Sequence, residues 1–257
     1  METLISRAIT GGFFSKLDAS MELDVAVVGA GPSGLMAALR LAQARKRVAI
    51  FERKLAPGGG IWGGAMLFNE VVFQPALAGL LSELGIRTER VQGDLLRADA
   101  VEVASALIYH TVHAGAVLFN AVTVEDVVFK NSRVAGVVVN WTPVNLEHMH
   151  VDPLVICSKI VLDSGGHHAE LTAQVARKAG IKLATPTGGI MGEKPMWAEE
   201  GERTTIENTG QVYPGLYVSG MAVNGVYGSF RMGPIFGGML LSGEKAATLM
   251  IEELGRA

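Results

Sequence analysis

A glycine-rich turn between two buried strands constrains the fold of this 257-residue chain more than any other feature. Residues 24–28 are a short valine-rich run, typical of a strand buried on both faces of a parallel sheet. The sequence Gly-Ala-Gly-Pro-Ser-Gly (29–34) follows, then a helical pattern over 35–44 and a second buried strand over 48–52. Together they form a βαβ unit of about 30 residues. This unit predicts a doubly wound Rossmann α/β sheet.

The spacing of the glycines matches a site for an ADP-containing dinucleotide. Gly29 permits the tight turn, Gly31 lets the backbone approach a pyrophosphate, and Gly34 lets the helix pack on the strand. The helix N-terminus offers free N–H groups to the phosphates, and Ser33 can add a hydroxyl donor. Glu52 lies 18 residues after Gly34, at the end of the second strand, where a carboxylate accepts hydrogen bonds from ribose hydroxyls. The sequence therefore predicts an enzyme that holds a dinucleotide.

Several alternatives stay open at this point. A glycine turn in an α/β fold can lack a ligand. Arg53 could favour a 2′-phosphate, although the carboxylate of Glu52 would repel that group. The motif also does not choose between NAD and FAD, and a second glycine-rich loop, 55–66, stands where many flavoproteins keep a cofactor-covering loop. Gly60 in this loop would approach the nucleotide, and we expect its apolar residues Ile61, Trp62 and Met66 to be buried.

The rest of the chain predicts one domain over residues 1–257. We expect an N-terminal amphipathic helix and an antiparallel β insertion at about 122–145, whose strands are separated by Asn131-Ser132. The remaining expected helices and strands come from hydrophobic periodicity. The helices are 3–18, 75–84, 98–114 and 234–254, and the strands are 122–130, 133–141, 159–162 and 216–219.

Composition limits the partners and the location. A net charge of −3 gives no basic surface for nucleic acid. No apolar run reaches the ~18 residues of a membrane span, and no targeting segment is visible, so we expect a cytoplasmic protein. The single cysteine, Cys157, cannot form an intrachain disulfide and is expected in the core. A mean hydropathy of +0.32 is high for a monomer's surface and favours assembly.

All six histidines fall between residues 110 and 168, and four of them lie in the segments 148–153 and 163–168. In an extended segment His150 and Asp152 point to the same side. His167 follows a glycine pair at a strand end, where open sheets place ligand contacts. Imidazole and carboxylate together suit a transition metal such as iron(II) or zinc. Isolated histidines are also common as hydrogen-bonded structural residues, so the spacing alone leaves both interpretations open.

Several motifs together resemble the thiamine thiazole synthase family, over nearly the whole chain, and 221–238 is an especially specific stretch. The resemblance implies a flavoprotein-related α/β fold and a transferase of EC class 2.4.2. Such an enzyme consumes NAD and builds an adenylated thiazole carboxylate from NAD, glycine and a sulfur source. The motifs are Gly29–Gly34 with Glu52-Arg53, Pro57–Met66, His150–Pro153, Gly166-His167 and Arg231–Pro234.

One departure from the family pattern concerns the sulfur. In the eukaryotic branch, a cysteine two residues before the Asp-Pro pair gives up its own sulfur. Here that position is His150, which has no sulfur to donate, and the only thiol is seven residues further on. The resemblance therefore implies the sulfide-using, iron-dependent branch, which turns over repeatedly.

The resemblance also implies roles for named residues. His150, Asp152 and His167 would form the catalytic centre, with Asp152 and His167 as iron(II) ligands. Arg231, expected to be partly enclosed, would grip the carboxylate of glycine with its fork of donors. The assembly would be a homo-octamer in which Asp152 reaches into a neighbour's site. Besides the glycines of the turn, the dinucleotide would be lined by Ser33, Glu52, Arg53, Gly60, Val124, His150, Val151, Asp152 and Met221.

Two rival functions fit the same glycine motif. An FAD-dependent oxidoreductase would use the identical turn, but 257 residues leave little room for the substrate domain that such enzymes carry. A non-catalytic NAD-binding subunit would leave the histidine and aspartate cluster without a role.

Overall fold

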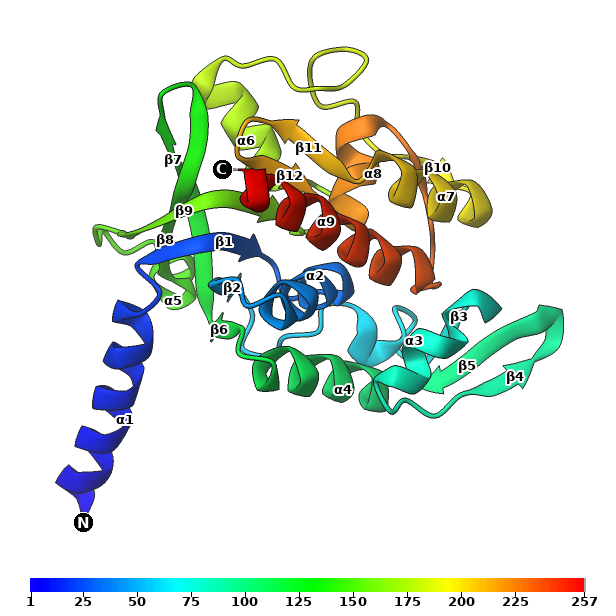
Figure 1. The fold of residues 1–257 in the computed structure, drawn as a ribbon, viewed down its shortest axis with the longest axis horizontal. Helices are drawn as coiled ribbons and strands as arrows, with labels where there is room; N and C mark the ends of the chain where they lie inside the picture. The colour runs from blue at the N-terminus through cyan, green and yellow to red at the C-terminus, as the bar shows by residue number, and fades with distance from the viewer. Residues whose placement is uncertain (257) are drawn as a thin grey trace.

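An eight-stranded mixed sheet organises the computed structural model, which describes residues 1–256 (Figure 1). The strand order is β11-β12-β9-β1-β2-β6, while β8 pairs with both β7 and β9. The five strands from β12 to β6 are parallel, as the βαβ pattern predicts. The strands are β1 (Glu22–Val28), β2 (Val48–Glu52), β6 (Val117–Asn120), β7 (Val122–Lys130), β8 (Arg133–Trp141), β9 (Leu154–Asp163), β11 (Gly210–Tyr213) and β12 (Leu216–Val218).

Both faces of the sheet are covered, which confirms the predicted fold class. The side chains of β1 alternate, so Val25 and Val27 belong to one core and Ala26 to the other. The first core includes residues of α2 (Pro32–Gln43), α4 (Ala100–His113) and α9 (Gly237–Arg256). The second includes residues of α6 (Glu170–Ala179), α8 (Met221–Tyr227) and the β7–β8 hairpin.

The antiparallel hairpin has the predicted strands and turn. Asn131 and Ser132 both have positive φ, 51° and 56°, the conformation of a tight hairpin turn. The N-terminal helix α1 (Glu2–Asp18) extends away from the sheet (Figure 1), and Leu17 is its one buried residue. Apolar side chains on α1, among them Leu4, Ile9 and Phe14, are therefore exposed.

Two expected helices are too long at their start: the C-terminal helix begins at Gly237, after residues 234–236, and the helix expected over 98–114 also begins late. Residues 98 and 99 belong to strand β5 (Leu95–Asp99), and α4 begins at Ala100, where the carboxylate of Asp99 caps it by accepting from Glu102 N at 2.8 Å. Strand β5 joins β3 and β4 in a second antiparallel sheet that the sequence did not predict. The further elements are β3 (Glu70–Phe73), β4 (Glu89–Val91), β10 (Lys194–Met196), β13 (Phe230–Arg231), α3 (Ala78–Glu83), α5 (Thr142–Leu146), α7 (Ala198–Asn208), and the 3-10 turns η1 (Ile61–Gly63), η2 (Pro75–Leu77) and η3 (Gln92–Asp94).

The expectation that Cys157 packs in the core is wrong. Strand β9 alternates, with Ile156 and Ser158 buried and Cys157 exposed between them. The apolar composition of this segment predicted burial on both faces, whereas its first half has one open face. Within residues 1–256, no helix has the length and apolar character needed to span a membrane.

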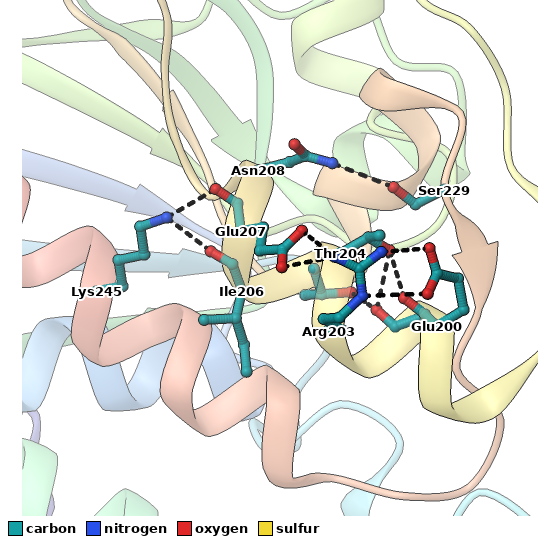
Figure 2. Close-up of polar contacts among 10 residues, drawn as sticks. Glu200, Arg203, Thr204, Ile206, Glu207, Asn208, Ser229 and Lys245 are labelled. Carbon is teal, nitrogen blue, oxygen red and sulfur yellow. Dashed lines mark hydrogen bonds and ion pairs between the residues drawn. The ribbon is translucent and has the colours of Figure 1, made fainter.

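Helix α7 is tied to α9 and to the segment before Arg231 (Figure 2). Lys245 of α9 donates to the terminal carbonyls of Ile206 and Glu207, at 2.8 and 2.7 Å. This is a cationic cap of the end of a helix. Asn208 contacts Ser229 Oγ at 3.5 Å. These contacts hold the end of α7 against α9 and beside the residue that precedes β13.

Candidate functional site

The glycine turn between β1 and α2 has the geometry that its spacing predicts. Gly29 has φ of +96°, and a Cβ there would lie 2.7 Å from Ser164 O. A Cβ on Gly34 would lie 2.1 Å from Gly29 O, so this glycine is needed for the packing of helix on strand. Gly31 is the N-cap of α2, and no described atom lies within 4 Å of the position of its Cβ. The helix N-terminus therefore opens onto free space at Gly31.

Glu52 supports this turn from the end of β2. Its side chain is buried; Oε2 accepts from Ala30 N and Oε1 from Lys54 N, both at 2.8 Å. A carboxylate has about four acceptor sites, so capacity remains for a ligand hydroxyl. Ser33 differs from its expected role as a free donor, because its hydroxyl is buried and donates to Ser219 Oγ at 2.7 Å.

Two adjoining cavities lie along this edge of the sheet. The Glu52 cavity, about 420 Å³, is lined by predicted residues Gly29, Gly31, Glu52, Arg53, Gly60, Val124 and His167. The Arg231 cavity, about 500 Å³, is lined by predicted residues Ser33, Gly60, His167, Met221 and Arg231. The two share Gly60, Ser164, Gly166 and His167. A ligand that follows the shared wall would pass His167 between the two ends.

The turn that carries His167 is held by a buried carboxylate. Asp163, fully buried at the end of β9, accepts from Thr172 Oγ1 at 2.7 Å, from Thr172 N at 3.0 Å and from Gly165 N at 3.0 Å. Burial raises the pKa of Asp163 above its ordinary range. Its bond to Thr172 N also supplies the cap that Ala169 cannot give to α6. Asp163 is thus a structural support of the turn.

The imidazole of His167 contacts a residue that sequence reasoning missed. Its Nδ1 lies 3.0 and 3.1 Å from the two carboxylate oxygens of Glu193. Glu193 directly precedes β10 and is 26 residues from His167 along the chain. No motif marked it, because a lone glutamate after a glycine carries no signal until the fold brings it to a histidine.

Arg231 is less enclosed than expected. Met232 beside it is fully buried, but the side chain of Arg231 is exposed at the wall of its cavity. Its carbonyl accepts from Trp197 N at 3.1 Å, which fixes the backbone and leaves the guanidinium accessible.

In the other glycine-rich loop, Ile61 is buried and Trp62 half-buried, as expected, but Met66 is 57% exposed, so its predicted burial is wrong.

The His150 segment lies apart from both cavities in this chain. His150, Val151 and Asp152 are exposed, and Val151 and Asp152 line a third, apolar groove of about 330 Å³ with Phe14 and Trp141. His167 is not among the residues of that groove. In the described part of the chain, no three His, Cys, Asp or Glu side chains are grouped closely enough to hold a metal. One chain therefore does not bring Asp152 and His167 into a common cavity.

The glycine turn, the acidic residue that ends β2 and the cavity at the carboxyl edge of the sheet define a class, the dinucleotide-binding α/β proteins. Residues 6–236 match the model of the Thi4 family. The chain belongs to this family, and the resemblance predicted from its motifs is confirmed.

Individual relatives match over almost the full length. The thiamine thiazole synthase of Desulfosudis oleivorans is 52% identical over 253 residues, which cover 98% of each chain. That of Thermococcus kodakarensis is 50% identical over 255 residues and 99% of each chain. The crystal structure of THI4 from Thermovibrio ammonificans matches with a TM-score of 0.97 at 50% identity, over 99% of each chain. The family is one of enzymes of thiamine thiazole biosynthesis.

Proposed function

We propose that this chain makes an adenylated thiazole carboxylate from NAD, glycine and sulfide, with iron(II), as a transferase of EC class 2.4.2. The observation that carries the proposal is the adjoining pair of cavities, with the glycine turn at one end, Arg231 at the other and His167 on the shared wall. An FAD-dependent oxidoreductase, the alternative for the same turn, is disfavoured by membership of the Thi4 family.

The chain's own residues divide the substrate into a held end and a reacting end. The open N-terminus of α2 at Gly31 would receive the pyrophosphate, and Glu52 the ribose hydroxyls of the adenosine. Nicotinamide would leave from the other ribose, which opens to a ketone. Arg231 would hold the carboxylate of glycine so that its amine condenses with that ketone.

Sulfur would come from sulfide. His150 stands where the eukaryotic family members carry the sulfur-donating cysteine, and imidazole has no sulfur to give. Cys157 is exposed on β9 and is not among the residues that line either cavity. With no protein sulfur consumed, each chain would turn over repeatedly.

Iron(II) fits the donor set that two chains would bring together. An imidazole from His167 and a carboxylate from Asp152 are ligands suited to this ion, and two protein ligands leave positions open for substrate. When bound, the metal supplies Lewis acidity toward carbonyl oxygens. Asp152 would come from a neighbouring chain of a homo-octamer. The exposed apolar groove next to Asp152, with Phe14 and Leu154 in its wall, supports such a contact.

The test is anaerobic incubation of the protein with NAD, glycine, sulfide and iron(II). We expect release of nicotinamide and several equivalents of adenylated thiazole per chain by mass analysis, with the intact mass of the protein unchanged. Loss of sulfur from Cys157, leaving dehydroalanine, with product formed in the absence of sulfide would overturn the sulfide assignment. Recovery of intact NAD under all of these conditions would overturn the function.

A further inference from the structure

The carboxylate of Glu193 is largely buried, and the proposed function gives it no role. Its side chain is 18% exposed and, within residues 1–256, forms an ion pair with His167. Both of its oxygens lie at hydrogen-bond distance from the same ring nitrogen, Nδ1, at 3.0 and 3.1 Å. The contact is therefore a hydrogen bond that sets the orientation of the imidazole ring, in addition to placing a negative charge beside it.

The approach of Glu193 to His167 is fixed by the backbone on both sides. Gly192 N donates to Gly225 O at 2.9 Å, and Lys194 N donates to Ser229 O at 2.9 Å, so the segment around Glu193 is held against the end of α8. The His167 backbone packs on the same helix, since a Cβ on Gly225 would lie 2.5 Å from His167 O. The Glu193 segment and the His167 turn are thus both packed on α8, which brings their side chains together.

The position of the carboxylate determines which ring nitrogen is available. A carboxylate only accepts hydrogen bonds, so a favourable contact requires the proton of a neutral His167 on Nδ1. The other nitrogen, Nε2, then carries the lone pair that a metal needs. A carboxylate behind a ligating histidine fixes the tautomer and the ring orientation and raises the basicity of the ligand.

We propose that Glu193 is a positioning residue for His167: it accepts the Nδ1 proton and holds the ring with Nε2 available for a metal ion. This inference rests on the proposed metal site and adds a residue to it. Direct ligation by Glu193 is the competing role, and glutamine separates the two. A glutamine keeps an acceptor oxygen for Nδ1, whereas it is a poor substitute for a ligating carboxylate.

The experiment measures cobalt(II) affinity of the full-length oligomer under anaerobic conditions, by visible absorption and by competition with a chelator. Glu193→Ala should bind cobalt(II) about 10–100-fold more weakly than the wild type, and Glu193→Gln should stay within about threefold of it. Glu102→Ala is the matched control, because Glu102 is similarly exposed (22%) and lies outside both cavities; it should bind like the wild type. Thermal unfolding confirms that each variant is folded.

Equal affinity of Glu193→Ala and the wild type would overturn the positioning role. So would a Glu193→Gln variant as weak as Glu193→Ala, which would indicate direct ligation. His167→Ala separates this inference from the proposed function. If the wild type binds no more cobalt(II) than His167→Ala, the metal site itself is wrong and the role of Glu193 falls with it.

Discussion

At the scale of single residues, the glycines of the turn have different structural roles, and substitutions of Gly34 and Gly31 distinguish two of them. Gly34→Ala places a methyl group against Gly29 O, at 2.1 Å, and we expect destabilisation of about 1–3 kcal/mol. Gly31 has φ of −76°, which alanine adopts freely, and open space at its Cβ. Gly31→Ala should therefore fold normally but weaken NAD binding by about tenfold or more, because its methyl group obstructs the pyrophosphate.

The two variants control one another in this measurement. Denaturant unfolding gives the stability of each, and titration with NAD gives the affinity of whichever is folded. A Gly31→Ala variant that binds NAD as tightly as the wild type would show that the phosphates do not approach this turn.

The geometry of the glycine turn can be predicted from the sequence, because all of its determinants are local. The turn, the helix and Glu52 lie within one βαβ unit, and their spacing along the sequence is enough to predict their geometry. Glu193 and the role of Asp163 were not predictable, since both depend on contacts between segments far apart in the chain. Asp152 is a third kind of case, because its predicted partner His167 would belong to another copy of the chain.

At the scale of elements, strand β5 shows where local pattern is insufficient. The expected helix 98–114 includes Ala98 and Asp99, which are the last two residues of this strand, and alanine is the best helix former. Pairing with β3 on one side and β4 on the other makes it a strand. Tertiary pairing overrides propensity in such cases. The central parallel strands are easier to predict from the sequence, because burial on both faces leaves a continuous apolar run.

Helix α7 offers an element-scale prediction through Glu202, which holds the first turn of α9. Its Oε2 accepts from Gly238 N at 2.5 Å and from Gln74 Nε2, while no partner of Oε1 occurs in the described chain. Burial raises the pKa of Glu202 above its ordinary value of 4.5. The folded state then binds more protons than the unfolded state above about pH 4.5, so the free energy of unfolding falls as pH rises through that window.

Glu202→Gln removes this titration and keeps an oxygen that can accept both hydrogen bonds. Its stability relative to the wild type should therefore increase from pH 4.5 toward neutral pH, measured by denaturant unfolding at several pH values. Asp163 also has a raised pKa, but it is present in both proteins and cancels in the difference. Glu200→Gln is the control, because Glu200 lies on the same helix but is paired with Arg203; this variant should not reproduce the trend. A constant difference for Glu202→Gln would contradict the prediction.

At the scale of the whole molecule, the separation of Asp152 from His167 within one chain implies that a site containing both residues needs two chains. Asp152 lies on an exposed loop beside an apolar groove, and His167 lies between the two cavities of the site. A homo-oligomer repeats the same contact at every copy, so each loop that enters a neighbour's site is matched elsewhere by a loop that enters its own. Each complete site would then combine the Asp152 of one chain with the His167 of another.

Mixed oligomers test this arrangement directly. Asp152→Ala and His167→Ala should each be inactive alone, because every site lacks one ligand. In oligomers co-expressed from both variants in equal amounts, about one quarter of the sites would pair an intact His167 with an intact Asp152, so about a quarter of wild-type thiazole formation should return. The double variant Asp152→Ala/His167→Ala co-expressed with either single variant should restore nothing, since no site can then be complete. If the mixture of single variants also stays inactive while assembling normally, the two residues act within one chain and the shared site is excluded.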